Sequence, residues 1–234
     1  MKLPETSSEL AQFEIAQSNF TNELTTNDLD PHAILQKVKK EREGKPTRID
    51  FLRRTVLAAE IAFQLKEDDS LGHLKLQKLL FLCQHTCSML LHTIFLKQAM
   101  GPYDPVLMRS LDNQFKKREW FQYNPKGFRK YLSLNNCGDH KEWYLRYFEE
   151  EVDNINYVIG LLKKANMDQA ELVGTTFACW LNGINNNSVI SDEFLIQKVY
   201  DWHETKAEKF TREQITKAIK WMNEKGLHPI RKRL

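Results

Sequence analysis

An apolar stretch followed by a rigid break is the feature that most constrains this chain. Half of residues 75–82 are leucine, and this run predicts a helix from His73 to about Lys97, which is followed by the sequence Gly101-Pro102-Tyr103-Asp104-Pro105. Proline lacks an amide proton and restricts the residue before it, so this sequence ends the first helix. The carboxylate of Asp104 can then cap a second, amphipathic helix that runs toward Trp120. The sequence thus predicts two helices joined by a rigid loop.

The rest of the chain predicts a mainly α-helical single domain with one small β-hairpin. Apolar residues recur at helical spacing in residues 50–66, 142–164, 168–182, 192–209 and 212–225. Residues 121–134 instead alternate, and they contain Asn124-Pro125-Lys126-Gly127, a turn signal between two short extended pieces. We expect the single hairpin there.

The N-terminal part differs from the rest in composition. Residues 1–29 are rich in Ser, Thr, Asn, Gln and Glu, which predicts a loosely ordered or partner-dependent N-terminal arm. Residues 30–46 predict a charged helix that begins at Asp30-Pro31 and ends at Gly44-Lys45-Pro46. Residues 47–234 then form the expected helical domain.

Composition narrows the class of protein. The chain has 234 residues, of which 41% are hydrophobic, enough for a substantial core. It has neither an apolar run of roughly 20 residues nor an apolar region near Met1, so we expect no membrane span, no signal peptide and a cytoplasmic location. The four cysteines lie mostly in apolar helical patterns, which favours free thiols over disulfides.

The sequence offers no convincing catalytic or metal site. Cys83 and Cys87 are four residues apart with His85 between them, a spacing unlike that of structural zinc sites. Trp202-His203-Glu204 has no predictable nucleophile beside it, so packing is the favoured interpretation. No Gly-rich phosphate loop is present. We therefore expect a protein that is not an enzyme and uses no cofactor and no metal.

One basic segment admits two interpretations. The net charge of +3 is too small to indicate nucleic acid by itself. Near the hairpin, however, cations alternate with aromatic residues, as in proteins that bind single-stranded nucleic acid. The favoured interpretation is that the hairpin buries its aromatics and leaves the cations in water; the alternative is weak contact with nucleic acid. The cations are Lys116, Lys117, Arg118, Lys126, Arg129 and Lys130.

Three sequence runs carry a family resemblance: Leu74-Lys75-Leu76-Gln77-Lys78-Leu79-Leu80-Phe81, then Gly101-Pro102-Tyr103-Asp104-Pro105, then Trp120-Phe121. Together they resemble the Panacea (SocA-like) domain family. Its members are small, mainly α-helical bacterial and phage proteins that act as antitoxins, by neutralising a toxin directly or by delivering it to a protease. The resemblance implies a module that binds a partner protein in toxin control or phage defence.

The last third adds a narrower likeness to the version of this domain appended to specificity subunits of type I restriction-modification systems. It lies in Leu172-Val173-Gly174-Thr175 through Trp180, Trp202-His203-Glu204-Thr205-Lys206, Ala218-Ile219-Lys220-Trp221-Met222 and Gly226-Leu227-His228-Pro229. Residues 30–43 are similar to a charged helix of those subunits. The alternative function is therefore an accessory part of such a subunit that contacts DNA phosphates or the other subunits. Without target-recognition domains, sequence-specific DNA reading is not expected.

The candidate partner-binding residues come from the first two runs. Lys75, Gln77 and Lys78 either lie at the edge of the core or form an exposed stripe beside a partner groove, and the two are compatible. The rigid loop presents Tyr103 reproducibly, which suits a binding hot spot. The sequence leaves the oligomeric state open. The full candidate set is Lys75, Gln77, Lys78, Gly101, Pro102, Tyr103 and Asp104.

Overall fold

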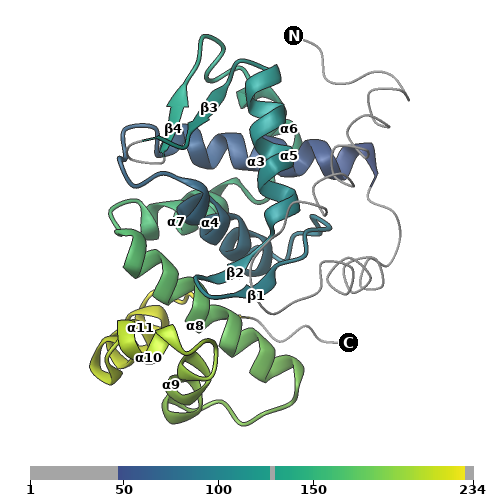
Figure 1. Cartoon of the computed structure of the whole chain (residues 1–234). Coiled ribbons are helices and arrows are strands. Elements are labelled where there is room, and N and C mark those ends of the chain that lie inside the picture. Colours follow the sequence, from purple (N-terminus) through teal and green to yellow (C-terminus); the bar gives the residue numbers. More distant parts are fainter. Residues whose placement is uncertain (1–46, 127–129, 230–234) are drawn as a thin grey trace.

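The computed structural model describes residues 47–126 and 130–229 (Figure 1). The N-terminal arm and the charged helix expected at residues 30–46 lie outside these residues, as does Arg129. The helical elements are α3 (Arg48–Gln64), α4 (His73–Thr86), α5 (Pro105–Lys117), α6 (Lys141–Phe148), α7 (Val152–Leu162), α8 (Met167–Asn185), α9 (Asp192–Tyr200), α10 (Thr205–Lys209) and α11 (Arg212–Glu224).

Two small antiparallel hairpins accompany the helices. β3 (Phe121–Asn124) pairs with β4 (Lys130–Ser133), as the sequence predicted, with Phe121 opposite Ser133. β1 (Leu96–Gln98) pairs with β2 (Gly101–Tyr103), with Leu96 opposite Tyr103. The mainly helical fold is confirmed, but the sequence predicted only the hairpin of β3 and β4 and missed the hairpin of β1 and β2.

The additional hairpin exists because the helix expected to reach Lys97 ends at Thr86. Ser88 and His92 adopt positive φ angles of 51° and 49°, which non-glycine residues rarely adopt and which a helix cannot contain. The chain therefore leaves the helix and turns, so that Leu96–Gln98 can pair with the Gly-Pro sequence. The predicted helices at 142–164 and 192–209 are likewise each divided into two shorter ones.

Helix α4 forms the centre of the molecule. Every residue from Leu74 to Cys83 is buried, and the helix packs against α3, α7, α8 and β2 (Figure 1). A helix enclosed on all sides belongs to the core of a domain rather than to its surface. The C-terminal helices α9 and α11 pack on α8, on the far side of α8 from α3 (Figure 1).

Local sequence signals explain where several helices begin. Thr47 and Asn166 start α3 and α8 with reciprocal capping boxes, in which side chain and backbone satisfy one another. Asp104 caps α5 through Leu107 N, with Pro105 in the first turn, as the sequence predicted.

The four cysteines are free. Among residues 47–126 and 130–229, no helix is long and apolar enough to cross a bilayer.

Candidate partner-binding site

The polar residues of α4 do not form an exposed stripe. Lys75, Gln77 and Lys78 are each 0% exposed, so the expectation that they flank a partner groove on the surface was wrong. The physical reason is that each side chain ends on a backbone carbonyl of a neighbouring segment. A buried polar group is stable when it is hydrogen-bonded in this way.

Gln77 holds the start of α5. Its Nε2 donates to Asp104 O at 2.6 Å, and Asp104 N donates back to Gln77 Oε1 at 3.0 Å. The carboxylate of Asp104 in turn accepts from Leu107 N at 2.9 Å and from Ile94 N at 3.3 Å. Asp104 is therefore held through its amide, its carbonyl and its side chain, which leaves the residue before it little freedom.

Lys78 holds the other side of the same loop. Its Nζ donates to Pro102 O at 2.6 Å. Glycines make room for the side chain: a Cβ atom at Gly174 would lie 2.7 Å from Lys78 Cδ, and one at Gly101 would lie 3.2 Å from Lys78 Nζ. Burial lowers the pKa of Lys78 to about 7, with a further lowering by the positive charge of Lys206.

Lys75 contacts the loop before α4 and the loop between α7 and α8. Its Nζ lies 2.5 Å from Asp68 Oδ2, in the loop before α4, and donates to Ala165 O, between α7 and α8, at 2.6 Å. It also donates to Lys163 O at 3.3 Å. Lys75 therefore ties the end of α7 to the start of α4, and its role in the described structure is internal.

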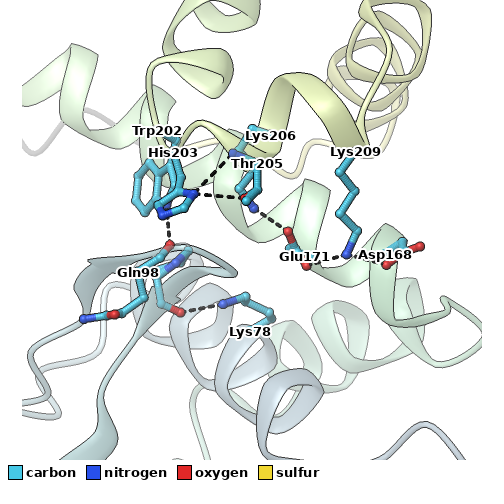
Figure 2. Close-up of polar contacts among 10 residues, drawn as sticks. Lys78, Gln98, Asp168, Glu171, Trp202, His203, Thr205, Lys206 and Lys209 are labelled. Carbon is cyan, nitrogen blue, oxygen red and sulfur yellow. Dashed lines mark hydrogen bonds and ion pairs between the residues drawn. The ribbon is translucent and has the colours of Figure 1, made fainter. Parts of the chain in front are cut away.

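The tip of the β1–β2 hairpin is held from the C-terminal side. Trp202 Nε1 donates to Gln98 O at 2.7 Å (Figure 2). His203 Nδ1 lies 3.0 Å from Thr205 Oγ1. Trp202 is buried and His203 makes hydrogen bonds, which are the contacts that the packing interpretation of Trp202-His203-Glu204 expects.

A buried ionic cluster lies next to this contact. Lys206 forms an ion pair with Glu171 in α8, and Lys209 Nζ lies 2.9 Å from the second oxygen of Glu171 and 2.6 Å from Asp168 Oδ1 (Figure 2). Burial lowers the pKa of Lys206, while the hydrogen bond with Glu171 opposes that effect. The cluster joins α8 to α10.

Tyr103 is presented by this supported loop. It is half-buried and packs against the core, with the backbone of both neighbouring residues held by α4. Burial raises the pKa of Tyr103 to about 12, and the nearby charges of Asp112 and Tyr123 add to the effect. The Tyr103 side chain is therefore a neutral, well-positioned phenol with part of its surface in water.

A cluster of aromatic and ionisable side chains lies close to Tyr103. His73 Nε2 is 2.8 Å from Asp112 Oδ2, and Tyr131 OH donates to Asp112 Oδ1 at 2.6 Å. The ring of Tyr123 stacks on His73, with ring centroids 3.6 Å apart. His73, Asp112 and Tyr123 are each partly exposed. Tyr103, His73, Asp112 and Tyr123 together form a surface that we call the Tyr103 surface.

The basic segment is largely explained by the hairpin. Phe121 and Tyr131 are buried, and Lys126 is exposed, as the favoured interpretation required. Lys130 Nζ lies 2.5 Å from Asp69 Oδ1, which offsets its charge. Lys116 and Lys117, at the end of α5, are exposed.

Arg118 is a correction to the candidate nucleic-acid contacts. Its side chain is only 4% exposed, its Nη2 donates to Gln114 Oε1 at 3.1 Å, and its guanidinium lies over Trp120 at 5.2 Å. Arginine commonly packs against aromatic rings in this way, so an arginine next to two lysines need not share their exposure.

Sequence reasoning did not find His73 and Asp112, which come from the start of α4 and the middle of α5. For Tyr123 and Tyr131, the alternating pattern of the predicted hairpin was the one sequence signal that could have placed both rings on one face.

Within residues 47–126 and 130–229, no three His, Cys, Asp or Glu side chains come together as a metal site would require. Comparisons of the chain with protein-family models, curated proteins and solved structures found no match.

Proposed function

We propose that this protein is a non-enzymatic protein-interaction module that binds one partner protein through the Tyr103 surface. The observation that carries this proposal is the rigid presentation of Tyr103: Lys78 holds Pro102 O and Gln77 holds Asp104 from inside the core. The resemblance to the Panacea family supplies the setting, a cytoplasmic bacterial or phage defence system in which the partner is a toxin that is neutralised or delivered to a protease.

Rigidity matters because binding has an entropic cost. Ordering a loop and its side chains at an interface opposes association, and a side chain that is already held avoids most of that cost. Tyrosine is also enriched among residues that dominate binding energy, since its ring buries a large area and its hydroxyl can still make a hydrogen bond. Tyr103 combines both properties, and Tyr123 extends the aromatic surface.

The test begins with the full chain, tagged and expressed in its native host, from which the partner is co-purified and identified. Calorimetry with the purified partner then compares the native protein with Tyr103→Ala. We expect about 2 kcal/mol of lost binding energy, or roughly thirtyfold weaker binding. Tyr147→Ala is a matched control, because Tyr147 is also half-buried but lies on α6.

An affinity that is unchanged in Tyr103→Ala would remove this surface from the interface. A thermal melt of both variants shows whether either substitution acts through unfolding. Equal losses in Tyr103→Ala and Tyr147→Ala would indicate a general effect on stability and would also count against the proposal.

The second candidate function is an accessory part of a restriction-modification specificity subunit that contacts DNA phosphates. The exposure of Lys116, Lys117 and Lys126 favours it. Fluorescence titration of labelled single- and double-stranded DNA should give weak binding that falls steeply with salt, because each neutralised phosphate releases condensed counterions. Changing Lys116 and Lys117 to Glu should abolish it, whereas Lys220→Glu on α11 should not.

A further inference from the structure

An open groove runs along the C-terminal helix on elements that carry none of the Tyr103 surface. It has a volume of about 560 Å³ and lies between the end of α7, the first half of α8 and one face of α11. Gln214, Lys217, Ala218 and Trp221 are spaced three or four residues apart, so they line it from a single face of α11.

The floor of the groove is apolar. Leu172 and Val173 of α8 and Phe210 at the end of α10 form it, with Leu161 and Trp221 at its sides. Beside it, Tyr157 OH donates to Lys225 O at 2.8 Å, which ties α7 to the end of α11. The groove is large enough for several apolar side chains, since sites that hold a ligand commonly enclose about 300–1,000 Å³.

The rim of the groove favours an acidic occupant. Two lysines, Lys164 and Lys217, and a single aspartate, Asp168, line it, so the lining has a net charge of +1. Asp168 is paired with Lys209, whose Nζ lies 2.6 Å away, and Lys217 is paired with Glu213, whose Oε1 lies 2.6 Å from its Nζ. The net positive charge of the lining therefore comes from Lys164. An apolar segment that carries carboxylates would complement both the floor and the rim.

The chain itself contains such a segment. Residues 3–36 include six Asp or Glu and no Lys or Arg. Within them, Leu10, Phe13, Phe20 and Leu24 follow one another at spacings of three, seven and four residues, the pattern of one helical face. Glu9, Glu14 and Glu23 lie between or beside these apolar residues.

We propose that residues 9–24 bind along this groove of the same chain, with their apolar side chains on Leu172, Val173 and Trp221 and their carboxylates toward Lys164 and Lys217. The connecting residues 25–46 can span roughly 70 Å when all are extended, at about 3.3 Å per residue, and roughly 42 Å when residues 30–46 form the predicted helix, at about 1.5 Å per residue. A domain of this size has a radius of gyration of about 16 Å, and either span is longer than twice that radius. The proposal does not depend on a role for Tyr103.

The experiment uses the full chain with the photo-cross-linking residue p-benzoylphenylalanine in place of Phe13. Illumination followed by mass spectrometry should find cross-links to groove residues of α8 and α11 in the same chain. Ala218→Trp fills the groove and should abolish them. Asn223→Trp adds the same ring to an exposed position of α11 outside the groove and should leave them unchanged.

A second variant tests the charge argument without adding bulk. Lys164→Glu combined with Lys217→Glu should lower the cross-link yield severalfold at low salt, while Lys220→Glu should not. Mixing light and ¹⁵N-labelled protein separates intramolecular from intermolecular products. Cross-links that join light to heavy chains would assign the groove to a second copy, and cross-links that fall outside the groove or persist in Ala218→Trp would equally overturn the proposal.

Discussion

Substitution of Glu171 by glutamine should destabilise the protein strongly, because it leaves a buried ammonium without its counter-charge. The side chains of Lys206 and Glu171 are 0% and 2% exposed. Glutamine keeps the shape and one oxygen acceptor but removes the negative charge. Breaking a buried ion pair by removing one partner costs about 3–5 kcal/mol. For a chain of this length that corresponds to a fall in melting temperature of about 6–20 °C.

Replacement of Lys206, the other partner of this ion pair, should lower the free energy of unfolding by less. In Lys206→Met, Glu171 retains Lys209, whose Nζ lies 2.9 Å from its second oxygen. The double variant Glu171→Gln with Lys206→Met should be more stable than Glu171→Gln alone, since no unpaired ammonium remains at position 206. Glu193→Gln is the surface control: Glu193 and Arg212 form an ion pair with side chains 66% and 60% exposed, and such pairs contribute about 0–1 kcal/mol.

Urea denaturation followed by circular dichroism measures these differences in the free energy of unfolding. A double-mutant cycle over Glu171 and Lys206 isolates their interaction. The reasoning is refuted if Glu171→Gln costs no more than Glu193→Gln, or if the effects of the two substitutions are additive.

Three further substitutions test the loop supports. Gln77→Leu leaves the amide and the carbonyl of Asp104 without these partners and should cost about 1–3 kcal/mol for each group in urea denaturation. Gly101→Ala puts a Cβ at a φ of 91° and 2.6 Å from Thr175 Oγ1, and should lower the melting temperature measured by calorimetry. Because the pKa of Lys78 falls to about 7 from its ordinary 10.5, the unfolded chain binds more protons between these pH values. Unfolding free energy should therefore rise with pH in that window by up to about 1.4 kcal/mol per unit, and this rise should be missing in Lys78→Met.

The helical fold was predictable because its signals are local. The spacing of apolar residues located the helices, Asp104 predicted the cap of α5, and the turn at Asn124-Pro125 predicted the hairpin of β3 and β4. The β1–β2 hairpin was missed because the residues after Thr86 look helical in sequence, whereas the positive φ at Ser88 depends on the surrounding structure.

The burial of Lys75, Gln77 and Lys78 was not predictable from the sequence for a different reason. Polar and charged residues between leucines match the pattern of an amphipathic surface helix. Their acceptors are 90, 27 and 24 positions away in the chain, so no local pattern records them. The same holds for His73 and Asp112, which are 39 positions apart and meet only in the folded protein.

The enclosure of α4 has a consequence for how the protein opens. Lys75, Gln77 and Lys78 join this helix to the α7–α8 connection, to the start of α5 and to β2, so α4 cannot separate from any one of them alone. Local fluctuations can release helices at the surface, but they cannot release α4. Its amide protons should therefore exchange with deuterium only through global unfolding and should report the full stability of the domain.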